Sequence, residues 1–146
     1  MNTESTNLYD RGETAGFLRR LAAMFYDCVL LLALLAVATT LITLPFGMPS
    51  ASGLLLYQFF LFEIIPLLFF TGFWSRGGQT LGMRAWHLKV VKEDGTQVAW
   101  KDAFKRHLAA IFSCLTFGLG FLWILVDPQG LAWHDRLSKT RLIRLV

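Results

Sequence analysis

The sequence predicts an all-α membrane protein with three hydrophobic helical segments. Of the 146 residues, 55% are hydrophobic and only 16% are charged, and the mean hydropathy is +0.50. A soluble domain usually has about a quarter of its residues charged. The apolar residues also gather in long runs, at about 17–44, 54–74 and 108–126. A spanning helix needs roughly 20 apolar residues, which the third run barely supplies.

One domain is expected from this length, with residues 1–13 as a flexible tail and residues 14–146 as the membrane domain. The small residues Ala36–Ala38 resemble a signal-peptide cleavage site. However, the apolar run continues past them, and Asp27 interrupts the run before them. We therefore expect a retained membrane helix instead of a cleaved signal.

The first segment carries charges on one predicted helical face. Arg20, Ala23 and Asp27 are spaced three or four residues apart, so they share a face of a regular helix. Asp27 would lie about 10 Å along the helix axis from Arg20. Small residues beside it allow another backbone to approach closely. This face should therefore point into a helix bundle and not toward lipid.

The second segment contains Glu63, and Pro66 follows it by less than one turn. A proline inside a helix removes one hydrogen bond and frees a carbonyl group near residue 62. A charge at the centre of a bilayer costs roughly 2.5 to 3.5 kcal/mol, so Glu63 needs a partner, a proton or a wet cavity. The residue therefore fits either an ion or proton site or a helix-locking contact.

The distribution of Lys and Arg predicts the orientation, since cytoplasmic loops are enriched in them. The N-terminal tail through Arg20 has three, and the link at 45–53 has none. The link at 75–107 has seven. We therefore expect the N-terminus and the long link on the cytoplasmic side.

The third segment leaves two alternatives. Four basic residues follow it, and they would lie outside if it spans but inside if it enters and returns. Gly118 and Gly120 could form the necessary bend. The continuous apolar stretch favours a span, and the charges favour a re-entrant segment.

The long link is predicted to contain a β-hairpin and an interfacial helix. Asp94-Gly95 is a strong turn signal between segments rich in β-branched residues. In the helix that follows, Trp100, Phe104 and Leu108 share an apolar face. Basic residues around this face would contact anionic lipid headgroups. The candidates for these contacts are Arg84, Lys101, Lys105 and Arg106.

The sequence offers little for catalysis, metal binding or redox chemistry. The three histidines are scattered without metal-ligand spacing. The glycines near residue 80 lack the Walker lysine and a preceding strand, so they do not indicate a phosphate loop. Cys28 and Cys114 are expected to be small buried hydrophobic residues and not a disulfide. We expect no enzyme, no cofactor, no metal and no nucleic-acid partner.

Four stretches in order resemble the RDD family of small membrane proteins: "GFLRRLAAMFYD", "FFLFE", "GGQTLGMRAWHLKVVKEDGTQVAWKDAFKRHL" and "GLGFLWILVDPQGLAWHDRLSKTRLI". The family is named for one arginine and two aspartates. Arg20 and Asp27 match the arginine and the first aspartate, and Asp135, between His134 and Thr140, matches the second. The basic residue expected after Gly82 stands one place later, at Arg84.

The resemblance implies a multi-pass inner-membrane protein that transports a small ion or solute, with cation/proton exchange as the usual suggestion. Arg20, Asp27, Glu63 and Asp135 are then the candidate polar site, and Arg20 pairs with Asp27 or Asp135. Three short segments seldom enclose a complete path, so we expect a homo-oligomer or a membrane-protein partner within the bilayer. The alternative is a non-transporting scaffold or accessory subunit, in which these charges lock helices together.

Overall fold

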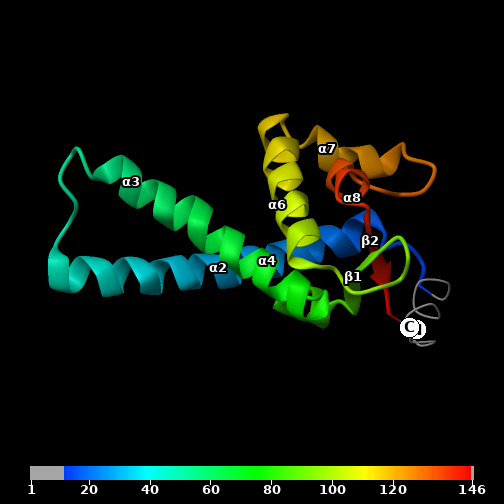
Figure 1. The fold of residues 1–146 in the computed structure, drawn as a ribbon, viewed down its shortest axis with the longest axis horizontal. Coiled ribbons are helices and arrows are strands. Elements are labelled where there is room, and N and C mark those ends of the chain that lie inside the picture. The colour runs from blue at the N-terminus through cyan, green and yellow to red at the C-terminus, as the bar shows by residue number, and fades with distance from the viewer. Residues whose placement is uncertain (1–11, 146) are drawn as a thin grey trace.

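The computed structural model describes residues 12–145, so most of the predicted tail at 1–13 lies outside the described residues. The described part is mostly helical, with one small sheet. Figure 1 shows two long helical segments that extend away from a compact part built by the remaining elements. The elements are α2 (Phe17–Phe46), α3 (Leu54–Phe59), the π-helix η1 (Phe60–Ile64), α4 (Ile65–Gly77), α5 (Leu81–Ala85), β1 (Leu88–Lys92), α6 (Trp100–Leu115), α7 (Leu119–Leu122), the 3-10 helix η2 (Trp123–Leu125), α8 (Trp133–Leu137) and β2 (Thr140–Arg144).

Helix α2 is long and apolar enough to cross a membrane, as predicted. It has 30 residues, and none of its most apolar 18 residues is buried within the chain. An exposed apolar surface of this size requires lipid or another membrane helix around it. The buried residues of α2 are Arg20, Ala23 and Asp27. They form the face that was predicted to point inward.

The second candidate span consists of α3, η1 and α4, and has 24 residues. Its helix is continuous, but the backbone widens in η1, where the N–H of Ile65 donates to the carbonyl of Phe60. Pro66 follows directly in the first turn of α4. A proline lacks its own N–H, and a π-turn is one way to accommodate it within a helix. The predicted break near Glu63 is thus a local π-turn.

The predicted local β-hairpin is wrong in its second strand. Strand β1 forms where expected and ends at the Asp94-Gly95 turn, but it pairs with β2 at the end of the chain. The pairing is antiparallel, with Val90 opposite Leu142. Residues 97–99 form no strand. β2 contributes the buried side chains of Leu142 and Ile143, which complete a core, whereas a hairpin alone is marginal in water.

The third apolar run is not a straight helix. Helix α6 begins at Trp100, so the predicted interfacial helix and the first part of the third run form one helix, which ends at Leu115. The chain then turns by 106° into α7 and η2. Phe117 and Gly118 both have positive φ, at 56° and 77°. The bend lies at one of the two glycines expected to allow it, and the pair is either a broken span or a re-entrant loop.

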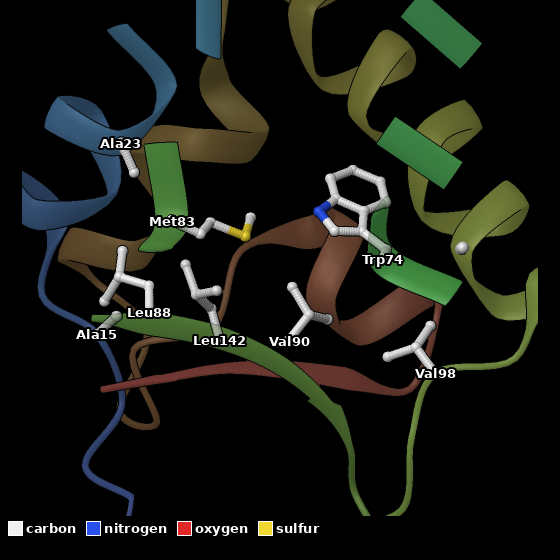
Figure 2. Packing of buried hydrophobic residues seen from close by; sticks show 9 residues of the cluster. Ala15, Ala23, Trp74, Met83, Leu88, Val90, Val98 and Leu142 are labelled. Atoms are coloured by element: carbon white, nitrogen blue, oxygen red, sulfur yellow. The ribbon is translucent and has the colours of Figure 1, made fainter. Parts of the chain in front are cut away.

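The hydrophobic core lies in the compact part, between the sheet, α5, the end of α4 and the beginning of α2. Figure 2 shows Leu88, Val90 and Leu142 of the sheet pointing toward Met83 and Trp74. This core joins residues near both ends of the described chain. Its members are Ala15, Ala23, Trp74, Met83, Leu88, Val90, Val98, Ala103 and Leu142.

Helix α6 buries small and polar residues and exposes apolar ones, the reverse of a helix in a soluble protein. Its buried face carries small and polar residues, including Ala103, Arg106 and Ser113. The apolar residues Trp100 and Leu108 are each 50% exposed. An apolar face directed outward is typical of a helix in contact with lipid. The free thiols Cys28 and Cys114 are likewise exposed and not buried as predicted.

Candidate functional site

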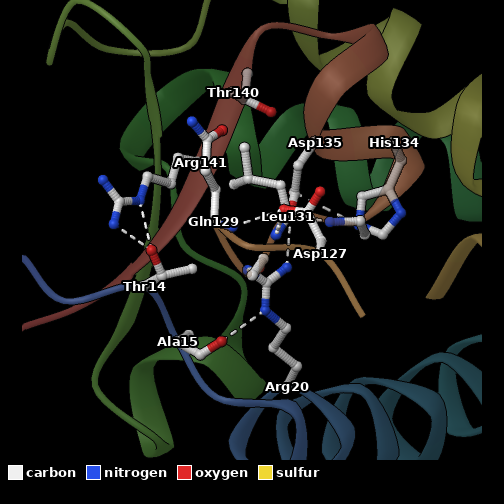
Figure 3. Close-up of polar contacts among 12 residues, drawn as sticks. Thr14, Ala15, Arg20, Asp127, Gln129, Leu131, His134, Asp135, Thr140 and Arg141 are labelled. Carbon is white, nitrogen blue, oxygen red and sulfur yellow. Dashed lines mark hydrogen bonds and ion pairs between the residues drawn. The ribbon is translucent and has the colours of Figure 1, made fainter. Parts of the chain in front are cut away.

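The centre of the site is the carboxylate of Asp135, which lies in the short helix α8. Its Oδ2 atom accepts a hydrogen bond from Arg20 Nη1 at 2.6 Å, and its Oδ1 atom accepts one from Arg106 Nη1 at 2.5 Å. Asp135 is fully buried, and both arginine side chains are at most 5% exposed. Oδ2 also accepts the N–H of Ala132, which fixes the first turn of α8. Figure 3 shows Arg20 reaching Asp135 from α2.

The two arginines have further partners around this carboxylate. Arg20 donates to the carbonyls of Ala15 and Gly130, at 2.9 Å and 3.1 Å. Arg106 donates to the hydroxyl of Thr140 at 2.7 Å. We call Arg20, Arg106, Asp135 and Thr140 the arginine–aspartate cluster. It joins α2, α6, α8 and β2, which are far apart in the sequence.

The electrostatics of this cluster keep Asp135 ionised. Burial alone would raise the pKa of its carboxyl, but Arg106, His134 and Arg20 together hold the pKa well below its ordinary value. His134 next to it is buried, and this burial lowers the pKa of its imidazole to about 3. The imidazole is therefore neutral near pH 7. The cluster then has two positive charges and one negative charge.

Asp27 forms a separate contact, although it shares a helical face with Arg20. Its carboxylate accepts the hydroxyl of Thr80 at 2.5 Å and the N–H of Gly82 at 2.9 Å. Thr80 is the N-cap of α5, and its hydroxyl also accepts the N–H of Met83. Asp27 thus holds the beginning of α5 against α2. Of the two partners predicted for Arg20, the structure selects Asp135.

Gly82 is required by the close approach of α5 to α2. A Cβ atom at this position would lie 2.9 Å from Cγ of Asp27 and would collide with the carbonyl of Ala23. Ala23 is one of the small residues expected to admit a neighbouring backbone. The small residues on both helices therefore allow the buried carboxylate to reach a backbone N–H.

Glu63 is half-buried in η1 and belongs to neither of these contacts. It lines a cavity of about 790 Å³, together with Arg20, Asp27 and His107. We call this space, between α2, α4, α6 and α7, the lateral cavity. It brings three of the four predicted polar residues to one space, although Asp135 is not among its lining residues.

The four predicted headgroup contacts differ in position. Arg84, Lys101 and Lys105 are exposed, so they remain free to contact lipid headgroups. The prediction for Arg106 is wrong, because this side chain is buried against Asp135 and Thr140. Without Arg106 the buried carboxylate of Asp135 would lose one of its two cationic partners, and such a loss is strongly destabilising.

The sequence interpretation missed the residues that bind the two aspartates. These are Arg106, which binds Asp135, and Thr80 and Gly82, which bind Asp27. Thr80 precedes a short apolar helix, which is the usual position of an N-cap. Arg106 shares a helical face with Ala103, and this small-residue face indicated a buried contact. No group of three His, Cys, Asp or Glu residues suitable for a metal ion occurs in residues 12–145.

Comparisons with known proteins show the family of this chain. Residues 14–139 match the sequence profile of the RDD family. Uncharacterized protein YckC of Bacillus subtilis (strain 168) is 31% identical over 140 residues, covering 92% of this chain and 85% of the relative. Uncharacterized protein YxaI of the same organism is 38% identical over 65 residues, covering 44% of this chain and 42% of the relative. No solved structure matches. The chain belongs to the RDD family of membrane-type proteins.

Proposed function

We propose that the protein crosses the plasma membrane twice and that both of its ends lie in the cytoplasm. The basic residues of the tail and of the long link support the cytoplasmic side. The contacts at the two ends of the described chain support a common side. Arg20 pairs with Asp135, and Thr14 forms a β-bridge with Ile143.

This topology makes the third apolar run a re-entrant or in-plane segment. If the chain crossed the membrane between Arg106 and Asp135, these residues would lie on opposite sides of it. Their side-chain atoms, however, lie 2.5 Å apart. Figure 1 shows α6 running across the direction of α2 instead of along it. The exposed apolar face of α6 would then lie in the headgroup region, with Lys101 and Lys105 near anionic headgroups.

Within this topology, the protein moves a small cation or a proton across the membrane. The observation that carries this proposal is that Asp27, Glu63 and His107 line the same cavity beside the first span. Carboxylates inside a membrane are costly and usually mark ion or proton pathways. Glu63 is the carrier group, since Asp27 already accepts two hydrogen bonds. Arg20, Arg106 and Asp135 hold the helices in place.

The transporting unit is an oligomer. Two spans do not enclose a path, and the most apolar windows of the two candidate spans are only 0% and 11% buried within the chain. A second copy would cover part of this surface. The partner copy would supply the other wall of the route past Glu63.

A scaffold or accessory subunit is the second candidate, and one observation favours it. Arg20, Arg106, Asp27 and Asp135 all have hydrogen-bond partners within the chain, as expected of residues that lock helices together. In this case the protein has no flux of its own. Its activity would be to hold a partner in the membrane.

A flux measurement separates the two candidates. Purified protein is placed in vesicles, and cation-driven proton movement is followed with a pH-sensitive dye. Transport predicts flux that Glu63→Gln abolishes and that the matched control Glu93→Gln, at an exposed position, leaves unchanged. Wild-type protein without flux, or flux that Glu63→Gln leaves intact, would contradict the transport proposal.

A further inference from the structure

The lateral cavity has walls that suit an alkyl chain. Its volume of about 790 Å³ lies within the usual range of ligand pockets, roughly 300 to 1,000 Å³. The walls come from both spans and from the bent third run. Most of the lining is apolar, with Met24, Phe70, Ile111, Phe121, Leu122 and Ile124 as representative residues.

One end of this cavity has polar atoms without partners. Arg106 Nε, Trp74 Nε1 and His134 Nδ1 are buried and form no hydrogen bond within the described part of the chain. All three residues line the cavity. Most buried polar atoms in proteins have a partner, so these three unpaired atoms, on residues that line one cavity, suit a ligand group that forms hydrogen bonds. The guanidinium of Arg106 lies over the Trp74 ring, 5.2 Å from its centroid, so these two residues are neighbours.

The charge at this end favours an anionic ligand. Arg20 and Arg106 share the single carboxylate of Asp135, which leaves one positive charge in excess. Asp27 also lines the cavity, but it lies seven residues beyond Arg20 along α2, about 10 Å by the helical rise, and is therefore farther from this end.

The other cavity carboxylate, Glu63, lies eleven residues before Trp74 along the same span. The helical rise places it about 16 Å away along the axis. The cavity therefore has a positive, donor-rich end and a long apolar part. Charge-assisted hydrogen bonds from a guanidinium favour a phosphate group at the positive end.

We propose that an anionic phospholipid of the surrounding bilayer occupies the lateral cavity. Its phosphate accepts hydrogen bonds from Arg106 Nε and Trp74 Nε1, and one acyl chain runs along the apolar walls toward Glu63. The bilayer supplies this occupant, because the spans around the cavity expose their apolar surface to it. The phosphate end is the end that the proposed topology places near the cytoplasmic headgroups.

Native mass spectrometry of the detergent-purified full-length chain tests the assignment. Delipidated protein is incubated with equal amounts of phosphatidylglycerol and phosphatidylcholine, which differ in headgroup charge. We expect one phosphatidylglycerol molecule per chain, retained at least tenfold over phosphatidylcholine. Ala110→Trp, which fills the cavity, should abolish retention. Trp74→Phe removes one donor but keeps a ring, and should reduce retention severalfold.

Two controls exclude the exposed surface as the binding site. Leu108→Trp adds bulk on the exposed face of α6, and Arg144→Gln removes an exposed positive charge elsewhere. Both should retain the lipid as the wild type does. Equal retention of the two lipids, retention unaffected by Ala110→Trp, or loss in the Arg144→Gln variant would overturn the proposal. A second copy of the chain that fills the cavity itself and excludes the lipid would overturn it as well.

Discussion

Replacing Asp135 with Asn should strongly destabilise the protein, because one carboxylate neutralises two buried arginines. The amide would keep one acceptor oxygen but would turn its NH₂ group toward the other guanidinium. Asp135 has no exposed surface, and Arg20 and Arg106 are 5% and 3% exposed, so water cannot replace the lost contact. Breaking a buried ion pair by removing one partner typically costs about 3 to 5 kcal/mol.

The expected loss corresponds to a fall of roughly 10 °C in the thermal midpoint of a chain of this size. The midpoint can be followed by size-exclusion chromatography of heated, detergent-solubilised protein. Asp102→Asn is the matched control, since Asp102 forms a half-exposed pair with Lys92 at 2.9 Å. Such pairs contribute less than about 1 kcal/mol. An Asp135→Asn midpoint equal to that of the control would show that Asp135 does not stabilise the two buried arginines.

Three further predictions concern the contacts around Asp27 and the charge of His134. Gly82→Ala should cost about 1 to 3 kcal/mol, because the added methyl collides with α2, and a melting curve within error of the wild type would contradict this. Thr80→Val keeps the shape of the side chain but leaves Asp27 without one donor; we expect a loss of about 1 to 3 kcal/mol, measured by the same melting assay. Acid should destabilise the folded state through His134. The pKa of its imidazole is about 3 in the folded chain and about 6.5 in the unfolded chain. Below about pH 6.5 the unfolded chain therefore binds a proton that the folded chain does not, which favours unfolding. The free energy of unfolding should fall by roughly 2 kcal/mol at pH 5, where Asp135 stays ionised. His134→Gln should flatten the pH dependence of the thermal midpoint between pH 5 and 8.

The sequence predicted the spans well, because long apolar runs and helical periodicity are local signals. The inward face of α2 followed from the spacing of Arg20, Ala23 and Asp27. A disruption of the helix near Glu63 followed from Pro66, although its form, a π-turn within a continuous helix, did not. The position of the bend at Gly118 was also a local signal.

The pairings depended on contacts across the chain, which periodicity does not report. Strand β1 has a good local turn, yet its partner β2 comes about fifty residues later, because only β2 completes the core. Arg106 resembled an interfacial residue, but its guanidinium pairs with Asp135. The choice between Asp27 and Asp135 as the partner of Arg20 likewise required the fold.

The most direct test of the account is the side of the membrane on which the C-terminus lies. Green fluorescent protein fluoresces when fused on the cytoplasmic side, and alkaline phosphatase is active when fused outside. Each reporter is attached to the end of the chain, and separately within the link at 47–53 between the two spans. With both ends in the cytoplasm, we expect fluorescence at the C-terminus and phosphatase activity at the link. Phosphatase activity at the C-terminus would contradict this topology, because Asp135 could not then reach Arg20.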